Sequence, residues 1–330
     1  MPNSVQQDFR RYATLIEAAL PAQIPFRARV ETATSVQVER GTIYPLALRH
    51  RTDEASLERV DRLIRLAAPP QSQEQRASPL PVLGSVAVVD RSGVRRPEYR
   101  PLLVYSWLQS FRLLYETLPR MEFGRWDEAL RAWCDLLEAE LTNTRIPEGA
   151  LPASRGGPAV EAALAALALF AAGKVFVRDA WTDLASDTFG RLTRGQRDGT
   201  GAFFTTTASD SPEVASYHEL ALLHAAASYA VQAEDRTVAA AVARATDFHQ
   251  RETQPDHASS QPWGLFAFIW NPTTRPLAEQ MLHAATVQSA GAGTGARAGT
   301  GDDDGVALIL LADALYCLRL FDGPAGRSNP

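Results

Sequence analysis

The chain has 330 residues, of which 45% are hydrophobic and 22% are charged, as in an ordinary folded soluble protein. Its formal net charge is -5 and it has no long run of Lys or Arg, which argues against a surface that neutralises nucleic-acid phosphates. This length exceeds the usual size of one hydrophobic core but suits a single repetitive helical domain. We therefore expect no nucleic-acid partner. The sequence does not indicate whether the chain forms oligomers.

The sequence favours a cytoplasmic protein without disulfides or a membrane span. Cys134 and Cys317 each lie in an apolar helical pattern, which is typical of buried free thiols. Residues 1–20 have apolar side chains at helical spacing and lack the uninterrupted apolar core of a signal peptide. The most apolar stretch, residues 159–177, is rich in alanine and carries Glu161 and Lys174, so it is a poor membrane span.

Residues 1–100 differ in pattern from the rest of the chain. Polar and β-branched residues alternate in 27–48, and the segment LGSVAVVDRSGVRR has a hairpin-like Asp-Arg-Ser-Gly turn. Between them, residues 53–70 have the spacing of a helix that ends at a Pro-Pro pair, and residues 69–81 are typical of a loop. We expect a small, helical and partly extended N-terminal region over 1–100.

From residue 101 onward the sequence predicts an all-α domain made of helical hairpins. Eight amphipathic segments are separated by loops rich in Gly, Pro or Asp: 102–118, 125–141, 158–172, 177–192, 212–232, 236–252, 275–290 and 304–321. Eight helices pair into four hairpins, with about fifty residues between successive hairpins. Long loops are predicted over 194–213 and 253–274, which suggests a functional face at one end of the array.

This organisation resembles the α/α toroid shared by terpenoid cyclases, protein prenyltransferases, six-hairpin glycosidases and several polysaccharide lyases. The resemblance covers roughly residues 101–321, and the segment DGTGAFF, from Asp198 to Phe204, carries it locally. It implies that the hairpins close into a ring. It also implies that the active site lies where the starts of the inner helices meet the connecting loops.

The segment SYHELALLHAAASY places polar side chains in an alanine-rich helix. Tyr217 and His224 are seven residues apart and return to nearly the same helix face. His218 and Glu219 lie near the start of the helix, whose positive end disfavours an imidazolium. A neutral histidine with Tyr217 could transfer protons, as the resemblance to toroidal lyases implies. The alternative is that Tyr217 and His224 are buried and satisfied by neighbouring helices.

The predicted loop 253–274 combines polar and aromatic residues. Asp256 and His257 are followed by Trp263 and Trp270, a combination that suits a sugar, because aromatic faces stack on pyranose C–H groups while polar groups take the hydroxyls. The alternative is that the aromatic residues fill the core and that Asp256 caps a turn. Asp198 also lies in a long loop, where it is a candidate carboxylate for glycoside hydrolysis or an ordinary turn residue.

Metal and cofactor sites have little support in the sequence. No HxxxH or HExxH motif occurs, the cysteines are far apart, and no Walker loop, nucleophile elbow or Rossmann fingerprint is present. We therefore expect no metal and no cofactor. Asp303 in the run 302–304 resembles the proton donor of some terpenoid cyclases, although the same letters suit a flexible linker before a helix.

The leading functional hypothesis is a carbohydrate-active toroid enzyme, either a lyase or a hydrolase, with a saccharide or another small molecule as its ligand. Its candidate catalytic residues are Tyr217, His218, His224 and Asp256. Its candidate substrate-binding residues are His257, Trp263, Trp270 and Asp198. Two alternatives stay open, a non-catalytic helical scaffold or ligand-binding protein and an isoprenoid-handling enzyme.

Overall fold

The computed structural model describes part of the chain. The described residues are 86–89, 95–98, 101–117, 124–144, 151–152, 156–197, 199–205, 212–252, 263–271, 273–278, 280–281, 310, 313–314, 316–317 and 320. The predictions for residues 1–81 therefore lie outside the described residues. The same holds for Asp198, Asp256, His257 and Asp303.

Two short pairs of strands accompany the helices. β1 (Val86–Val89) and β2 (Arg95–Glu98) pair antiparallel, with Val86 opposite Glu98 and Val89 opposite Arg95, which confirms the predicted hairpin. β3 (Leu151–Pro152) pairs in parallel with β4 (Phe204–Thr205), and Thr205 Oγ1 donates a hydrogen bond of 3.1 Å to the Leu151 carbonyl. This second pair joins the segment before α7 to the segment before α9.

Six of the eight predicted helices are present over nearly their predicted ranges. They are α5 (Pro101–Thr117), α6 (Gly124–Asn143), α7 (Gly156–Phe176), α8 (Asp179–Arg194), α9 (Pro212–Ala233) and α10 (Arg236–Glu252). Described helical residues also occur within 275–281 and 310–320, where the other two helices are predicted. Consecutive helices pack against each other, α5 with α6, α7 with α8 and α9 with α10. The all-α class is therefore confirmed.

The hairpins α7–α8 and α9–α10 turn in the same way. Val177 and Glu234 follow the last residues of α7 and α9 and take left-handed φ values of 52° and 55°. The next residue in each turn donates its N–H back into the helix, Arg178 to the Gly173 carbonyl and Asp235 to the Ala230 carbonyl, both at 3.0 Å. This is a Schellman motif, which glycine usually completes, so both turns place a side chain where backbone strain is expected.

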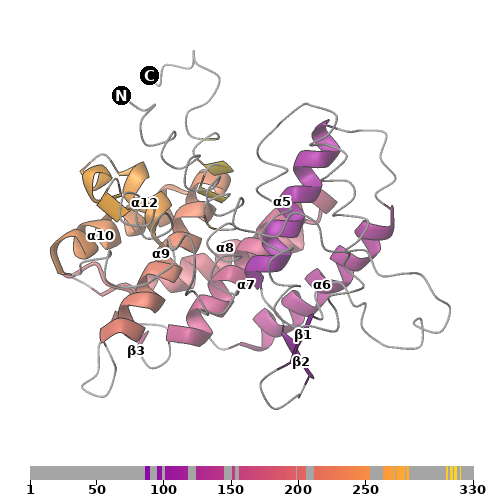
Figure 1. The fold of residues 1–330 in the computed structure, drawn as a ribbon, viewed down its shortest axis with the longest axis horizontal. Coiled ribbons are helices and arrows are strands. Elements are labelled where there is room, and N and C mark those ends of the chain that lie inside the picture. Colours follow the sequence, from indigo (N-terminus) through magenta and orange to yellow (C-terminus); the bar gives the residue numbers. More distant parts are fainter. Residues whose placement is uncertain are drawn as a thin grey trace, which may run out of the picture.

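Helix α7 lies at the centre of the array. It packs against α5, α6, α8 and α9, and Figure 1 shows α7 with α5 and α6 on one side and α9, α10 and α12 on the other. Because its residues are apolar all round, nearly the whole helix from Ala159 to Gly173 is buried. α7 is the one helix in the described part that is long and apolar enough to cross a membrane, but 78% of its most apolar window is buried within the protein.

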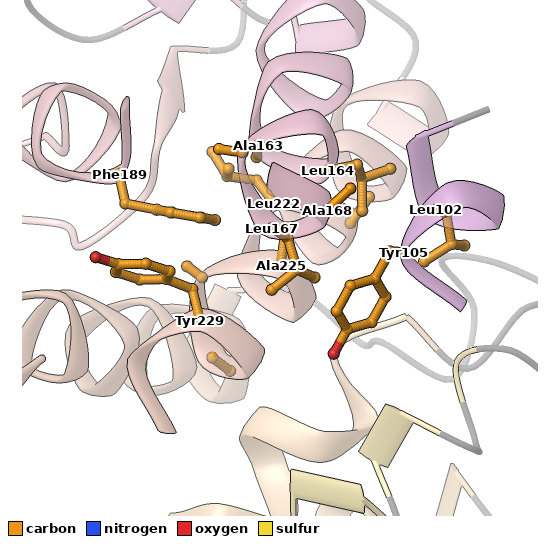
Figure 2. Close-up of a cluster of buried hydrophobic side chains, with 14 of the residues drawn as sticks. Leu102, Tyr105, Ala163, Leu164, Leu167, Ala168, Phe189, Leu222, Ala225 and Tyr229 are labelled. Carbon is orange, nitrogen blue, oxygen red and sulfur yellow. The ribbon is translucent and has the colours of Figure 1, made fainter. Parts of the chain in front are cut away.

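Large side chains fill the space around the alanine-rich helices. Figure 2 shows Leu102 and Tyr105 of α5 on one side of the α7 residues and Phe189 of α8 on the other. The Phe189 ring stacks on Tyr229 of α9 at 4.2 Å between centroids. The hydroxyl of Tyr105 points out of this apolar cluster, toward polar partners described below.

The predicted loop 253–274 contains a buried helix, which corrects the prediction of a loop throughout. α12 (Leu265–Trp270) has the sequence LFAFIW and packs against α9 and α10. Gly264 precedes it with φ of 77°, close to Leu220 and Phe268. A run of six residues is too short for sequence periodicity to identify, and burial against two longer helices decides its conformation.

Candidate functional site

Tyr217 and His218 are neighbours on the N-terminal half of α9, and both are partly exposed to solvent. α9 begins at Pro212, so both residues lie in its second turn. Their side chains are half-buried, and their rings meet edge to face with centroids 5.8 Å apart. A phenol and an imidazole are thus held side by side, the pair of groups that the sequence predicted for proton transfer.

The start of α7 lies directly against His218. A Cβ atom at Gly156 would lie 2.6 Å from His218 Nδ1, so only glycine permits this approach. The Phe204 ring of β4 also contacts the imidazole edge to face, with centroids 6.4 Å apart. Because helix N-termini carry partial positive charge, the α7 terminus adds a fixed dipole beside His218.

Trp263 connects Tyr217 to His224. Its ring meets Tyr217 at 5.9 Å and His224 at 5.6 Å between centroids, both nearly perpendicular. Tyr217, His218, His224 and Trp263 therefore form one continuous set of ring contacts, here called the aromatic cluster. Trp263 and His224 are buried, so within this cluster the surface is reached through Tyr217 and His218.

Behind His224 lies a buried carboxylate that sequence analysis missed. Asp313 is fully buried, and its Oδ2 lies 2.9 Å from His224 Nε2. Tyr105 Oη and Ser228 Oγ both donate short hydrogen bonds to the same carboxylate, which joins α5, α9 and the C-terminal segment at one point. Tyr105 and Asp313 are 208 positions apart in the chain.

Amide groups and a thiol extend this arrangement. Gln109 Nε2 donates to Tyr105 Oη at 2.9 Å and to Gln232 Oε1 at 2.8 Å, and Gln232 Nε2 donates to Tyr105 Oη at 2.6 Å. Cys317 Sγ lies 3.7 Å from Asp313 Oδ1. These side chains are called the central polar network: Tyr105, Gln109, His224, Ser228, Gln232, Asp313 and Cys317.

The sequence does carry a signal for this network. Its members recur four residues apart on each helix, Tyr105 with Gln109, His224 with Ser228 and Gln232, and Asp313 with Cys317. Polar residues at that spacing share one face of an otherwise apolar helix. A charged residue inside the apolar run 306–321 is a further sign, because aspartate is rarely buried without partners.

Both cysteines are buried free thiols, as predicted. Burial and the nearby Asp313 charge raise the pKa of the Cys317 thiol well above its ordinary value. Burial likewise raises the pKa of Cys134. Because thiolates are the reactive form of cysteine, both residues are chemically inert in this fold.

Glu219 holds the chain at the start of β4. Its carboxylate accepts hydrogen bonds from the backbone N–H groups of Phe203, at 3.0 Å, and Phe204. Burial raises the pKa of Glu219 to about 7, although both backbone hydrogen bonds oppose the shift. His249 of α10 has its Nε2 3.9 Å from the Glu219 carboxylate, and burial lowers its pKa to about 3.

The segment that carries the toroid resemblance, 198–204, forms a tightly held loop over its described residues 199–204. Gln196 Nε2 donates to the carbonyls of Gly201, at 2.6 Å, and Ala241, at 2.8 Å. Gly199 and Gly201 take positive φ values, and a Cβ at Gly201 would lie 2.3 Å from the Arg244 carbonyl oxygen. In this part of the loop, glycine serves the close packing of the chain against α10.

The remaining predicted binding residues are placed as follows. Trp263 is only 3% exposed, and Phe266 and Phe268 are fully buried, which agrees with the alternative that these aromatic residues fill the core. Trp270 is half-buried and stacks on Phe266 at 6.1 Å. Among the described residues, no group of three His, Cys, Asp or Glu side chains could hold a metal ion.

Comparison with known proteins gives no relative: no family model, no curated protein and no solved structure matches the chain. The resemblance to α/α toroids therefore rests on the order and pairing of helices.

Proposed function

We propose that the hairpins close into a small α/α ring. Helix α5 packs on α7, and α7 packs on α9. Asp313 then bonds to Ser228 of α9 and Tyr105 of α5, which returns the chain of contacts to its first helix. In this arrangement the central polar network lies where the inner helices converge, and its buried charge is held by donors from both α5 and α9.

We further propose that the protein is a carbohydrate-active enzyme that transfers protons at the aromatic cluster. The observation that carries this proposal is the half-buried pair Tyr217 and His218, continuous through Trp263 with a histidine beside a buried carboxylate. In an elimination on a uronate, an imidazole of the cluster takes the proton next to the carboxyl group. The Tyr217 phenol then protonates the departing oxygen.

The test is a panel of uronate polymers and neutral polysaccharides, read by the ultraviolet absorbance of unsaturated products and by the release of reducing ends. Tyr217→Phe should lose turnover while its thermal unfolding matches the wild type. Tyr229→Phe is the matched control, since it makes the same chemical change on α9 in a ring stacked on Phe189. Turnover that survives in Tyr217→Phe, or none with any polymer, contradicts the proposal.

A second candidate is a non-catalytic helical scaffold, which the burial of His224 and Asp313 favours. In a scaffold, the central polar network fixes the positions of the helices relative to one another, and the aromatic cluster is part of the packed core. The scaffold predicts that no saccharide protects the wild-type protein against thermal unfolding. A ligand-dependent rise in Tm that disappears in Tyr217→Phe decides against it.

A further inference from the structure

His224 is a buried polar side chain whose contacts leave it incompletely satisfied. It is fully buried, yet among the described residues Nδ1 has no hydrogen-bond partner. Nε2 lies 2.9 Å from Asp313 Oδ2 but is not aligned for a hydrogen bond with it. Buried polar groups are nearly always paired, and an exception calls for a specific explanation. Leaving such a group unpaired destabilises the folded state.

The neighbouring carboxylate is held in place from several directions. Tyr105 on α5 and Ser228 on α9 donate hydroxyl protons to Asp313, and the Cys317 thiol approaches its Oδ1. Asp313 therefore cannot turn away from His224 without breaking bonds to two helices. The negative charge of Asp313, 2.9 Å from Nε2, favours the proton on that nitrogen even without an aligned hydrogen bond, so that Nδ1 is left as the acceptor.

Trp263 links the buried His224 to the half-buried Tyr217. Its ring contacts both His224 and Tyr217. A ligand that reaches Tyr217 would next meet Trp263, and displacement of the indole would expose the imidazole. The contacts thus place the phenol outermost, the indole behind it and the histidine with its carboxylate innermost.

Resting on the proposed function, we propose that His224 is the proton acceptor of the site, that Asp313 is the residue that positions it, and that Trp263 covers it. Nδ1 takes the proton from the substrate carbon, and the electron pair left on that carbon forms the double bond. The carbon–oxygen bond breaks at the same time, and the leaving oxygen takes its proton from Tyr217. The Asp313 carboxylate balances the imidazolium charge.

The test is the histidine side-chain 15N NMR spectrum of the full chain, with His224→Gln used to assign the signals. We expect His224 in a single neutral tautomer, with the proton on Nε2. Asp313→Asn should remove this preference, whereas Ser228→Ala, which keeps the carboxylate, should retain it. A proton on Nδ1 in the wild type overturns the inference, and this result is read from the wild-type protein once its His224 signals are assigned.

The covering role of Trp263 is tested by carbethoxylation of histidines with diethylpyrocarbonate, followed by peptide mapping. His224 should be protected in the wild type and modified in Trp263→Ala, while Trp270→Ala, a change in the same region, leaves it protected. Equal protection in both variants contradicts the covering role. Neither experiment uses a substrate, so the proposed function and the inference can fail separately. The expected tautomer without any turnover rejects the proposed function alone. Turnover with the proton on Nδ1 rejects only the inference.

Discussion

The buried pair Glu219 and His249 should give opposite contributions to stability as pH changes. Burial raises the pKa of Glu219 from 4.5 to about 7, so the folded state binds this proton more tightly than the unfolded state. Its contribution is fully present below pH 4.5 and is lost as pH rises to about 7. Each pKa unit is worth about 1.4 kcal/mol, which gives about 3 kcal/mol for Glu219.

His249 has the opposite sign. Burial lowers its pKa from 6.5 to about 3, so its contribution is present above pH 6.5 and is lost as pH falls toward 3. Between pH 6.5 and 4.5 the loss amounts to about 3 kcal/mol. The two contributions to the free energy of unfolding therefore nearly cancel between pH 6.5 and 4.5. Measurements on the wild type alone would show neither of them.

Single variants should separate the two effects. The free energy of unfolding, measured by urea denaturation over a pH series, should show the wild type gaining about 3 kcal/mol over Glu219→Gln as pH falls from 7 to 4.5. Relative to His249→Gln, the wild type should lose about the same amount between pH 6.5 and 4.5. A constant cost of either substitution drops out, because only the change with pH is compared.

Two outcomes would refute this reasoning. A difference between wild type and Glu219→Gln that does not change with pH means that Glu219 titrates at its ordinary value. A difference that shrinks as pH falls means that Glu219 is stabilised as the anion, either by the backbone N–H groups of Phe203 and Phe204 or by a protonated His249. In the double variant Glu219→Gln, His249→Gln, neither pH-dependent contribution to the free energy of unfolding should remain.

The backbone geometry supports three further predictions, each read from the free energy of unfolding. Val177→Gly should stabilise by about 1 kcal/mol, because the valine is 87% exposed with a left-handed φ, and Glu234→Gly should act similarly; destabilisation by both contradicts the strain. Gly201→Ala should cost more than Gly199→Ala, since both have positive φ but only Gly201 meets the α10 backbone; equal costs exclude that contact. Asp235→Ala should cost about 1 kcal/mol, because its carboxylate caps two N–H groups of α10; no loss rejects the cap.

Most of the helical framework could be predicted from the sequence. Runs of apolar residues and the helix-breaking residues between them located the six helices from α5 to α10. The Asp-Arg-Ser-Gly turn located the β1–β2 hairpin. These features are local, since each depends on residues within one or two turns of the chain. The polar residues of α9 were also evident in the sequence, which identified Tyr217, His218 and His224 as candidate site residues.

Tertiary structure alone decided what those residues contact. Asp313 and Tyr105 meet across 208 positions, and no local pattern specifies such a pair. α7 is apolar on every side, so its sequence could not indicate which helices surround it. α12 is helical because α9 and α10 bury it. Trp263, just before α12, is buried where its ring contacts both Tyr217 and His224. Long-range burial, which sequence spacing does not encode, assembled the site.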